Sequence, residues 1–261
     1  MDLNLTGYHA LVCGGSKGIG FAAAQELAAL GASVTLLSRD EEALKNALEH
    51  LDASKNQKHR YLAADLGKPD DIRKFISDFV QDHPVHILVN NAGGPKSGPL
   101  TNADITQLRD AFATHVLSSQ VITQAVLPGM RKSGYGRIIN IISTSVKQPI
   151  PGLGVSNTIR GAMGNWSKTL AGEVASDGIT VNNVLPGMTN TDRLQELFER
   201  MADSQNKALE NYAEEIKKTI PMGRFATPAE IANAIAFLAS PAASYITGTN
   251  VVVDGGRTGS L

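Results

Sequence analysis

The sequence contains almost no cysteine. Cys13 is the only one among 261 residues, so no disulfide can form within the chain and a reducing compartment, the cytoplasm, is expected. A chain near this size buries roughly 75% of its unfolded surface, which is enough for a stable core without covalent links.

An excess of charge of one sign and a long apolar run are also missing. The 24 Lys and Arg residues nearly balance 25 Asp and Glu residues, which argues against a nucleic acid or an anionic membrane as partner. The longest apolar stretches, such as 234–239, are far shorter than the roughly 18 residues that span a bilayer. Residues 1–7 lack the basic start and apolar stretch of an export signal. We expect a soluble, cytoplasmic protein that acts on a small molecule.

What the sequence does contain is a regular alternation of two patterns. Short apolar runs of strand length alternate with longer segments of helical spacing along almost the whole chain. This alternation predicts a single α/β domain over 1–261, a doubly wound Rossmann fold with a seven-stranded parallel sheet and helices on both faces. We expect strands at 9–13, 33–38, 60–64, 86–90, 136–142, 180–185 and 250–253, and helices at 19–30, 41–51, 70–81, 105–130, 157–176 and 228–238.

One segment interrupts the alternation. Residues 188–222 contain no strand pattern and are rich in charged, helix-favouring residues. We interpret the segment as a helical flap over a binding site at the carboxyl ends of the strands. The alternative is a solvated helical hairpin with no function in binding.

A glycine-rich segment follows the first predicted strand and leads directly into a helix. Glycines at 14, 18 and 20 permit a tight turn, close approach of the backbone to a diphosphate, and exposure of the first helical amides to anionic oxygens. This position between a strand and a helix is typical of a dinucleotide site. The predicted contacts in this loop are Gly14, Ser16, Lys17, Gly18, Ile19 and Gly20.

The end of the second strand indicates which dinucleotide binds. An acid there would accept hydrogen bonds from a ribose 2′-hydroxyl and repel a 2′-phosphate, but the sequence has Ser38 and Arg39. A guanidinium favours phosphate, and Lys17 adds a second positive charge. We therefore predict NADP(H) over NAD(H), unless Arg39 and Lys17 are only solvated charges. Asp40 is expected to cap the next helix.

Four further motifs lie in or at the ends of later strands: Asn90-Asn91-Ala92-Gly93 ends the fourth, Gly136 to Ser143 forms the fifth, Pro186-Gly187 closes the sixth and Asp254-Gly255-Gly256 follows the seventh. With the glycine loop, they resemble the short-chain dehydrogenase/reductase family over essentially the whole chain, most closely its members similar to 3-oxoacyl-carrier-protein reductase. The resemblance implies a homotetramer and further contacts to the coenzyme from Asp65, Leu66, Asn91, Ala92, Gly93, Pro186, Gly187, Thr189 and Thr191.

The catalytic positions depart from the pattern of the family, whose main branch uses Asn, Ser, Tyr and Lys. Ser143 matches the serine, but Ser156 stands at the tyrosine position, Arg160 at the lysine position and His115 at the asparagine position. A serine hydroxyl is a much weaker acid than a phenol of pKa about 10, and arginine stays protonated. The sequence resembles a divergent branch of the family with Ser and Arg at the Tyr and Lys positions. Arg160 is still expected to bind ribose hydroxyls, because it lies on the same helix face as Ser156.

The proton donor must then come from elsewhere. Lys147, just past the fifth strand, is the best candidate, because a partly desolvated amine near Arg160 is expected to have a pKa lowered toward neutrality. Lys147 can instead be an exposed lysine, or bind a substrate carboxylate or phosphate without transferring a proton. His115 is either a proton relay through water or, as we favour, a structural residue. His83 and His86 have no companion ligands, so no metal is expected.

The sequence therefore predicts an NADP(H)-dependent oxidoreductase that moves hydride between nicotinamide and a carbonyl or alcohol carbon, and leaves its substrate open. The alternative, motivated by the missing Tyr and Lys, is a catalytically silent NADP(H)-binding protein that senses redox state or works through partners.

Overall fold

The computed structural model describes residues 1–260, without the side chain of Ser204. Its centre is a sheet of seven parallel strands in the order β3-β2-β1-β4-β5-β6-β7. This order reverses direction between β1 and β4, where the carboxyl ends of the strands leave a crevice for a ligand. The doubly wound prediction is confirmed, with strands β1 (His9–Cys13), β2 (Ser33–Ser38), β3 (Arg60–Ala63), β4 (Ile87–Asn90), β5 (Gly136–Ile141), β6 (Ile179–Pro186) and β7 (Asn250–Val253).

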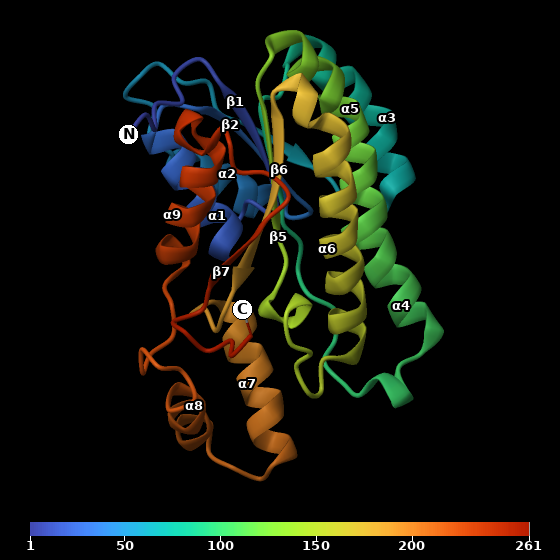
Figure 1. Cartoon of the computed structure of the whole chain (residues 1–261). Coiled ribbons are helices and arrows are strands. Elements are labelled where there is room, and N and C mark those ends of the chain that lie inside the picture. Colours follow the sequence, from blue (N-terminus) through green and yellow to red (C-terminus); the bar gives the residue numbers. More distant parts are fainter. Residues whose placement is uncertain (261) are drawn as a thin grey trace.

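Helices cover both faces of the sheet (Figure 1). One face carries α1 (Gly18–Ala29), α2 (Glu41–Glu49) and α9 (Pro228–Ala239), and the other carries α3 (Pro69–Asp82), α4 (Ile105–Phe112), α5 (Ser118–Ser133) and α6 (Gly154–Val174).

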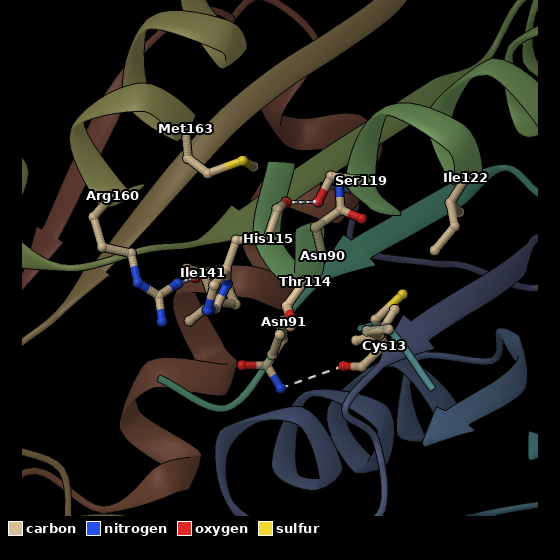
Figure 2. Close-up of a pocket in the computed structure, with 12 residues that line it drawn as sticks. Cys13, Asn90, Asn91, Thr114, His115, Ser119, Ile122, Ile141, Arg160 and Met163 are labelled. Atoms are coloured by element: carbon tan, nitrogen blue, oxygen red, sulfur yellow. Dashed lines mark hydrogen bonds between the residues drawn. The ribbon is translucent and has the colours of Figure 1, made fainter. Parts of the chain in front are cut away.

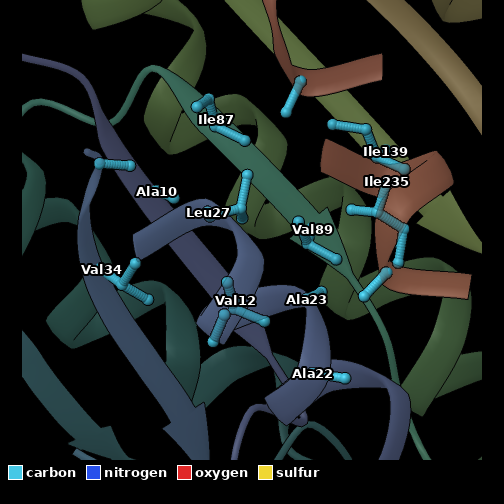
Figure 3. Packing of buried hydrophobic residues seen from close by; sticks show 14 of the residues in the cluster. Ala10, Val12, Ala22, Ala23, Leu27, Val34, Ile87, Val89, Ile139 and Ile235 are labelled. Atoms are coloured by element: carbon cyan, nitrogen blue, oxygen red, sulfur yellow. The ribbon is translucent and has the colours of Figure 1, made fainter. Parts of the chain in front are cut away.

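The core between α1, α9 and the sheet consists of interdigitated aliphatic side chains (Figure 3). Leu27 of α1 and Ile235 of α9 pack with Val12, Val89 and Ile139 of the sheet, and all five are almost fully buried. This packing fixes the strand ends from which the site is built.

Two helices follow β6 and lie beyond the carboxyl end of the sheet (Figure 1). They are α7 (Asp192–Ser204) and α8 (Leu209–Lys217), and they occupy the segment for which we predicted a helical flap. They share a small hydrophobic cluster of their own, in which the rings of Phe198 and Tyr212 meet edge to face with centroids 5.3 Å apart.

The helix predicted over 105–130 is present but is not one regular α-helix. Helix α4 ends at Phe112, a π-helical turn named η2 (Ala113–Leu117) follows without a gap, and α5 continues from Ser118. Such turns are frequent at functional sites. This turn carries His115.

A row of four asparagines ties the strands next to the site together. Asn90, Asn140, Asn183 and Asn250 lie in register on β4, β5, β6 and β7. Asn90 donates to Asn140 at 2.8 Å, Asn140 to Asn183 at 3.2 Å, and Asn183 to Asn250 at 2.8 Å. Asn140 is fully buried and also donates to the hydroxyl of Ser167 at 2.9 Å. These hydrogen bonds fix the relative positions of the strand ends.

Candidate active site

The glycine loop has the geometry of an anion-binding turn. Gly14 and Gly18 adopt φ values of +58° and +59°, a region that favours glycine. At position 20 a Cβ atom would collide with the carbonyl oxygen of Gly14 and lie 2.7 Å from the Asn91 amide nitrogen. Within the described residues, no side chain caps the start of α1 and no acid stands in its first turn. The first amides of α1 are therefore available to a diphosphate, and the residues of the loop fit a dinucleotide.

Asn91 positions this loop from the neighbouring strand end. Its side-chain amide donates to the carbonyl oxygens of Cys13 and Gly14 at 3.3 and 3.2 Å, and Figure 2 shows the first of these bonds. Cys13 itself is buried, and desolvation raises the pKa of its thiol to about 12. Cys13 is therefore a packing residue and holds no thiolate for redox chemistry.

The predicted 2′-phosphate site lies at the end of β2. The hydroxyl oxygen of Ser38 is buried and has no hydrogen-bond partner within residues 1–260, which is the condition of a group awaiting a ligand. The neighbouring side chain of Arg39 is exposed. Asp40 accepts from the amide of Ala43 at 3.0 Å, so the prediction that it caps α2 is confirmed. These residues fit a phosphorylated ribose.

Lys17 points toward α7. Its ammonium lies 3.4 Å from the carboxylate of Asp192, and both side chains are about three-quarters exposed. The pair therefore links the glycine loop to the first turn of α7, which the sequence did not indicate. An exposed pair of this kind adds little stability.

The segment after β6 approaches the glycine loop. Thr191 caps α7 by accepting from the amide of Leu194 at 3.3 Å, and its methyl carbon would lie 3.5 Å from a Cβ at Gly18. Thr189 is buried and donates to the carbonyl of Gly187 at 3.2 Å. Thr191, one of the predicted coenzyme contacts, thus lies beside Gly18 of the glycine loop.

Asp65, one of the predicted coenzyme contacts, stabilises a local turn. Its carboxylate accepts from the amide of Gly67 at 2.9 Å, as is typical of aspartate in turns. Leu66, which follows it, accepts from the hydroxyl of Ser118 through its carbonyl oxygen.

The predicted catalytic side chains come from β5, the turn that follows it and α6. Ser143 follows β5, is half-buried and accepts from the amide of Ser145 at 3.1 Å. Lys147 is half-buried at the end of the short helix η3 (Thr144–Val146). Ser156 and Arg160 lie one turn apart on α6, and Arg160 donates from Nη1 to the carbonyl of Ile141 at 2.9 Å. Ser143 and Arg160 therefore both lie at the end of β5.

Arg160 is a buried cation without an acidic partner. Its side chain is 8% exposed, and no carboxylate of the described residues lies within ion-pair distance. Desolvation, followed by the positive charge of Arg193, lowers the pKa of Arg160 to about 10. The guanidinium thus remains protonated at neutral pH and faces a second cation.

His115 lies beside Arg160. Desolvation and then the charge of Arg160 bring the pKa of His115 well below its usual range, although a hydrogen bond with the Gly93 backbone acts in the opposite direction. The imidazole is therefore neutral at physiological pH. His115, Arg160 and Asn91 line a cavity of about 10 Å³ (Figure 2), close to the smallest volume that holds one water molecule.

Sequence reasoning missed Arg193 of α7. Its Nη2 donates to the carbonyl of Pro95 at 2.7 Å, and a Cβ at Gly94 would lie 3.8 Å from Nη2 of Arg193 and 3.9 Å from Nη2 of Arg160. Two guanidinium groups thus flank Gly94. In the sequence, Arg193 is one of many charges on an amphipathic helix, and no spacing distinguishes it from its neighbours.

Residues 1–260 show neither a metal centre nor a membrane span. His, Cys, Asp and Glu side chains form no group of three or more able to hold a metal ion there. None of the helices in this range is long and apolar enough to cross a membrane.

Together, the doubly wound sheet and the uncapped helix behind a glycine turn define a dinucleotide-binding protein. Comparisons with known proteins agree. The family model described as enoyl-(acyl carrier protein) reductase matches residues 14–258. A 3-oxoacyl-[acyl-carrier-protein] reductase of Vibrio cholerae is 36% identical over 257 residues, covering 97% of this chain and 98% of its own. The chain belongs to the short-chain dehydrogenase/reductase family of oxidoreductases, so the predicted resemblance is confirmed.

Two solved structures are similar over nearly the full length. L-sorbose reductase of Gluconobacter frateurii, complexed with NADPH and L-sorbose, has a TM-score of 0.93 at 30% identity, with 100% of both chains covered. A gluconate 5-dehydrogenase of Burkholderia cenocepacia, in complex with NADP and tartrate, has a TM-score of 0.88 at 27% identity, covering 100% of this chain and 98% of its own.

Proposed function

We propose that this protein is an NADP(H)-dependent oxidoreductase that transfers hydride between nicotinamide and a carbonyl or alcohol carbon. The observation that carries the proposal is the uncapped start of α1 behind Gly14, Gly18 and Gly20, in a chain that belongs to an oxidoreductase family. The similar structures were solved with NADPH or NADP, which supports the choice of coenzyme.

The residues that would hold NADP(H) follow the strand ends. The amides of the glycine loop bind the diphosphate, Ser38 and Arg39 bind the 2′-phosphate, and Asp65 contacts the adenine. The other proposed contacts, after β3, β4 and β6, are Leu66, Ala92, Gly93, Pro186, Gly187, Thr189 and Thr191. When bound, the coenzyme supplies or accepts the hydride.

The chain then has to stabilise the oxygen and move one proton. Ser143 hydrogen-bonds the carbonyl oxygen, whose carbon receives the hydride, and Lys147 donates the proton that completes the alcohol. Ser156 lies on the face of α6 that carries Arg160 and contributes a hydroxyl to the substrate side. The carbonyl compound, one hydride and one proton together give the alcohol, so atoms and electrons balance.

The test follows NADPH absorbance with a panel of ketones, 3-oxoacyl thioesters, quinones and sugars. We expect turnover with at least one class and a loss of about 10²- to 10⁴-fold in kcat for Lys147→Ala, with the Kd for NADPH unchanged. Lys168→Ala is the control. Lys168 donates to the carbonyl of Gly248 at 3.1 Å, just before β7 begins and away from the carboxyl ends of the strands. Full activity of Lys147→Ala would contradict the proton-donor assignment.

A silent NADP(H)-binding protein is the second candidate, favoured by Ser156 and Arg160 at the positions of the family's Tyr and Lys. It predicts tight NADPH binding without turnover across the whole panel. The same assay therefore separates the two candidates.

We also propose a homotetramer in a reducing compartment such as the cytoplasm. Ile105, Phe112 and Leu117 on α4 and η2 are 74%, 40% and 43% exposed, and apolar exposure on neighbouring turns is typical of an interface. Light scattering should give a mass four times the 27.6 kDa of the chain. A monomer mass would contradict the proposal.

A further inference from the structure

The strongest unexplained feature outside the coenzyme contacts is the arginine pair at Gly94. Arg160 is nine-tenths buried and uses Nη1 on the carbonyl of Ile141, while its Nη2 faces the space beside Gly94. Arg193 reaches the same space from α7 with Nη2 and Nε. Two cations held together in a partly desolvated place repel each other unless an anion lies between them.

No carboxylate of residues 1–260 serves as the anion between the two arginines. Within residues 1–260, the acid that contacts the pair is Glu196, 3.5 Å from Nη1 of Arg193 and on the same helix. Glu196 also lies 3.4 Å from Arg200 and is half-exposed, and Arg160 has no such contact. The Nη2 atoms of both arginines face the space beside Gly94, and no carboxylate of residues 1–260 forms an ion pair with both of them.

The position of the pair separates it from the coenzyme diphosphate. The diphosphate site lies at the end of β1, where α1 begins, and Lys17 and Asp192 face each other there. Arg193, the next residue of α7, turns instead to Pro95, which follows β4. Arg160 is held by Ile141, two residues before Ser143. The pair therefore lies on the side of the crevice where Ser143 would bind the reacting oxygen.

We propose that Arg160 and Arg193 together bind a carboxylate of the substrate, so that the substrate class is oxo acids and the corresponding hydroxy acids. A guanidinium binds a carboxylate through planar, charge-assisted hydrogen bonds, and the absence of a side chain at Gly94 leaves the room for this group. Another N–H of Arg160 can still serve a ribose hydroxyl, since the group has five. This inference rests on the proposed function, because it names the substrate of the same site.

The contribution of Arg193 from α7 has a structural consequence. Its bond to Pro95 connects the segment predicted as a flap to the loop after β4. A bound carboxylate would add a second connection through Arg193 and Arg160. Under this proposal the flap segment contributes directly to recognition of the acid.

The binding test uses the complex with NADP⁺ and two probes of the same four-carbon skeleton, tartrate and threitol. Calorimetry should show tartrate binding about 10- to 100-fold more tightly than threitol. Arg193→Gln should abolish this preference and leave the Kd for NADP⁺ within about 3-fold. Gly94→Val, which fills the space without removing charge, should also weaken tartrate.

The control is Arg200→Gln. Arg200 is on the same helix, pairs with the same Glu196 and is 44% exposed, so its loss removes a comparable surface ion pair. It should retain the full preference for tartrate. Equal binding of tartrate and threitol by the native protein would overturn the proposal, as would a tenfold loss of NADP⁺ affinity in Arg193→Gln, which would assign the pair to the coenzyme.

Turnover separates this proposal from the proposed function. L-Sorbose and 5-keto-D-gluconate differ only in that a terminal hydroxymethyl group of one is a carboxylate in the other. With NADPH, the acid should have the larger kcat/KM, by about 10-fold or more, and Arg193→Gln should reduce that ratio toward one. If the protein prefers tartrate but turns over no carbonyl compound, the carboxylate site is supported and hydride transfer is contradicted. If the sugar has the larger kcat/KM, the carboxylate site alone is contradicted.

Discussion

Removal of Asn140 tests whether the asparagine row holds the strand ends of the site. Asn140 is fully buried, accepts from Asn90 and donates to Asn183 and Ser167. Truncation to alanine leaves one donor of Asn90 and one acceptor each of Asn183 and Ser167 without these partners. Each orphaned buried group costs about 1 to 3 kcal/mol, so the free energy of unfolding should fall by about 4 kcal/mol.

Urea unfolding followed by circular dichroism measures this loss, and two variants define its origin. Asn140→Leu restores most of the volume but none of the hydrogen bonds, so it should be nearly as destabilising as Asn140→Ala. Asn46→Ala, at an exposed position of α2, should leave stability unchanged or raise it slightly. If leucine recovered native stability, the cavity and not the hydrogen bonds would explain the effect, and the reasoning would be refuted.

Two further predictions concern charge. His9 is buried between Thr35 and Pro84, and desolvation lowers its pKa from 6.5 to about 4. The unfolded chain therefore binds this proton first, so the stabilising contribution is complete above pH 6.5 and declines as the pH falls toward 4, by about 2 kcal/mol at pH 5. Urea midpoints at pH 8 and 5 test this, and a His9→Asn variant with the same pH dependence as the native protein would contradict it. Arg39→Asp should weaken NADPH binding about 100-fold and NADH by less than about 3-fold, as measured by fluorescence titration. Equal weakening would place the 2′-phosphate elsewhere.

Much of the fold follows from local patterns in the sequence. Both main signals are local. The apolar pattern of the seven strands can be recognised within a few neighbouring residues, and so can the spacing of the glycines at 14, 18 and 20. The handedness of the crossovers then limits the possible strand orders. It also places ligands at the carboxyl ends of the strands, so the sequence alone indicates where the coenzyme crevice lies.

The remainder depends on contacts between residues far apart in the chain. The π turn at His115 interrupts a helix that the sequence predicts as regular. Asn140 meets Asn90 and Asn183 only because β4, β5 and β6 lie in register, and it meets Ser167 only because α6 packs against β5 and β6. Arg193 meets Arg160 only through the path of α7 back to Gly94. None of these partners is marked by spacing, so local reasoning could not find them.

The central claim is that the amides at the start of α1 bind the diphosphate of NADP(H). Isothermal titration calorimetry of the native protein with NADPH tests it most directly, with Gly20→Val as the comparison, because a side chain there would collide with Gly14 and Asn91. We predict one site per chain with a Kd in the range of about 1 to 100 μM, and a large loss of affinity in the variant. Absence of binding heat with both NADPH and NADP⁺, over a range of temperatures, would contradict the account.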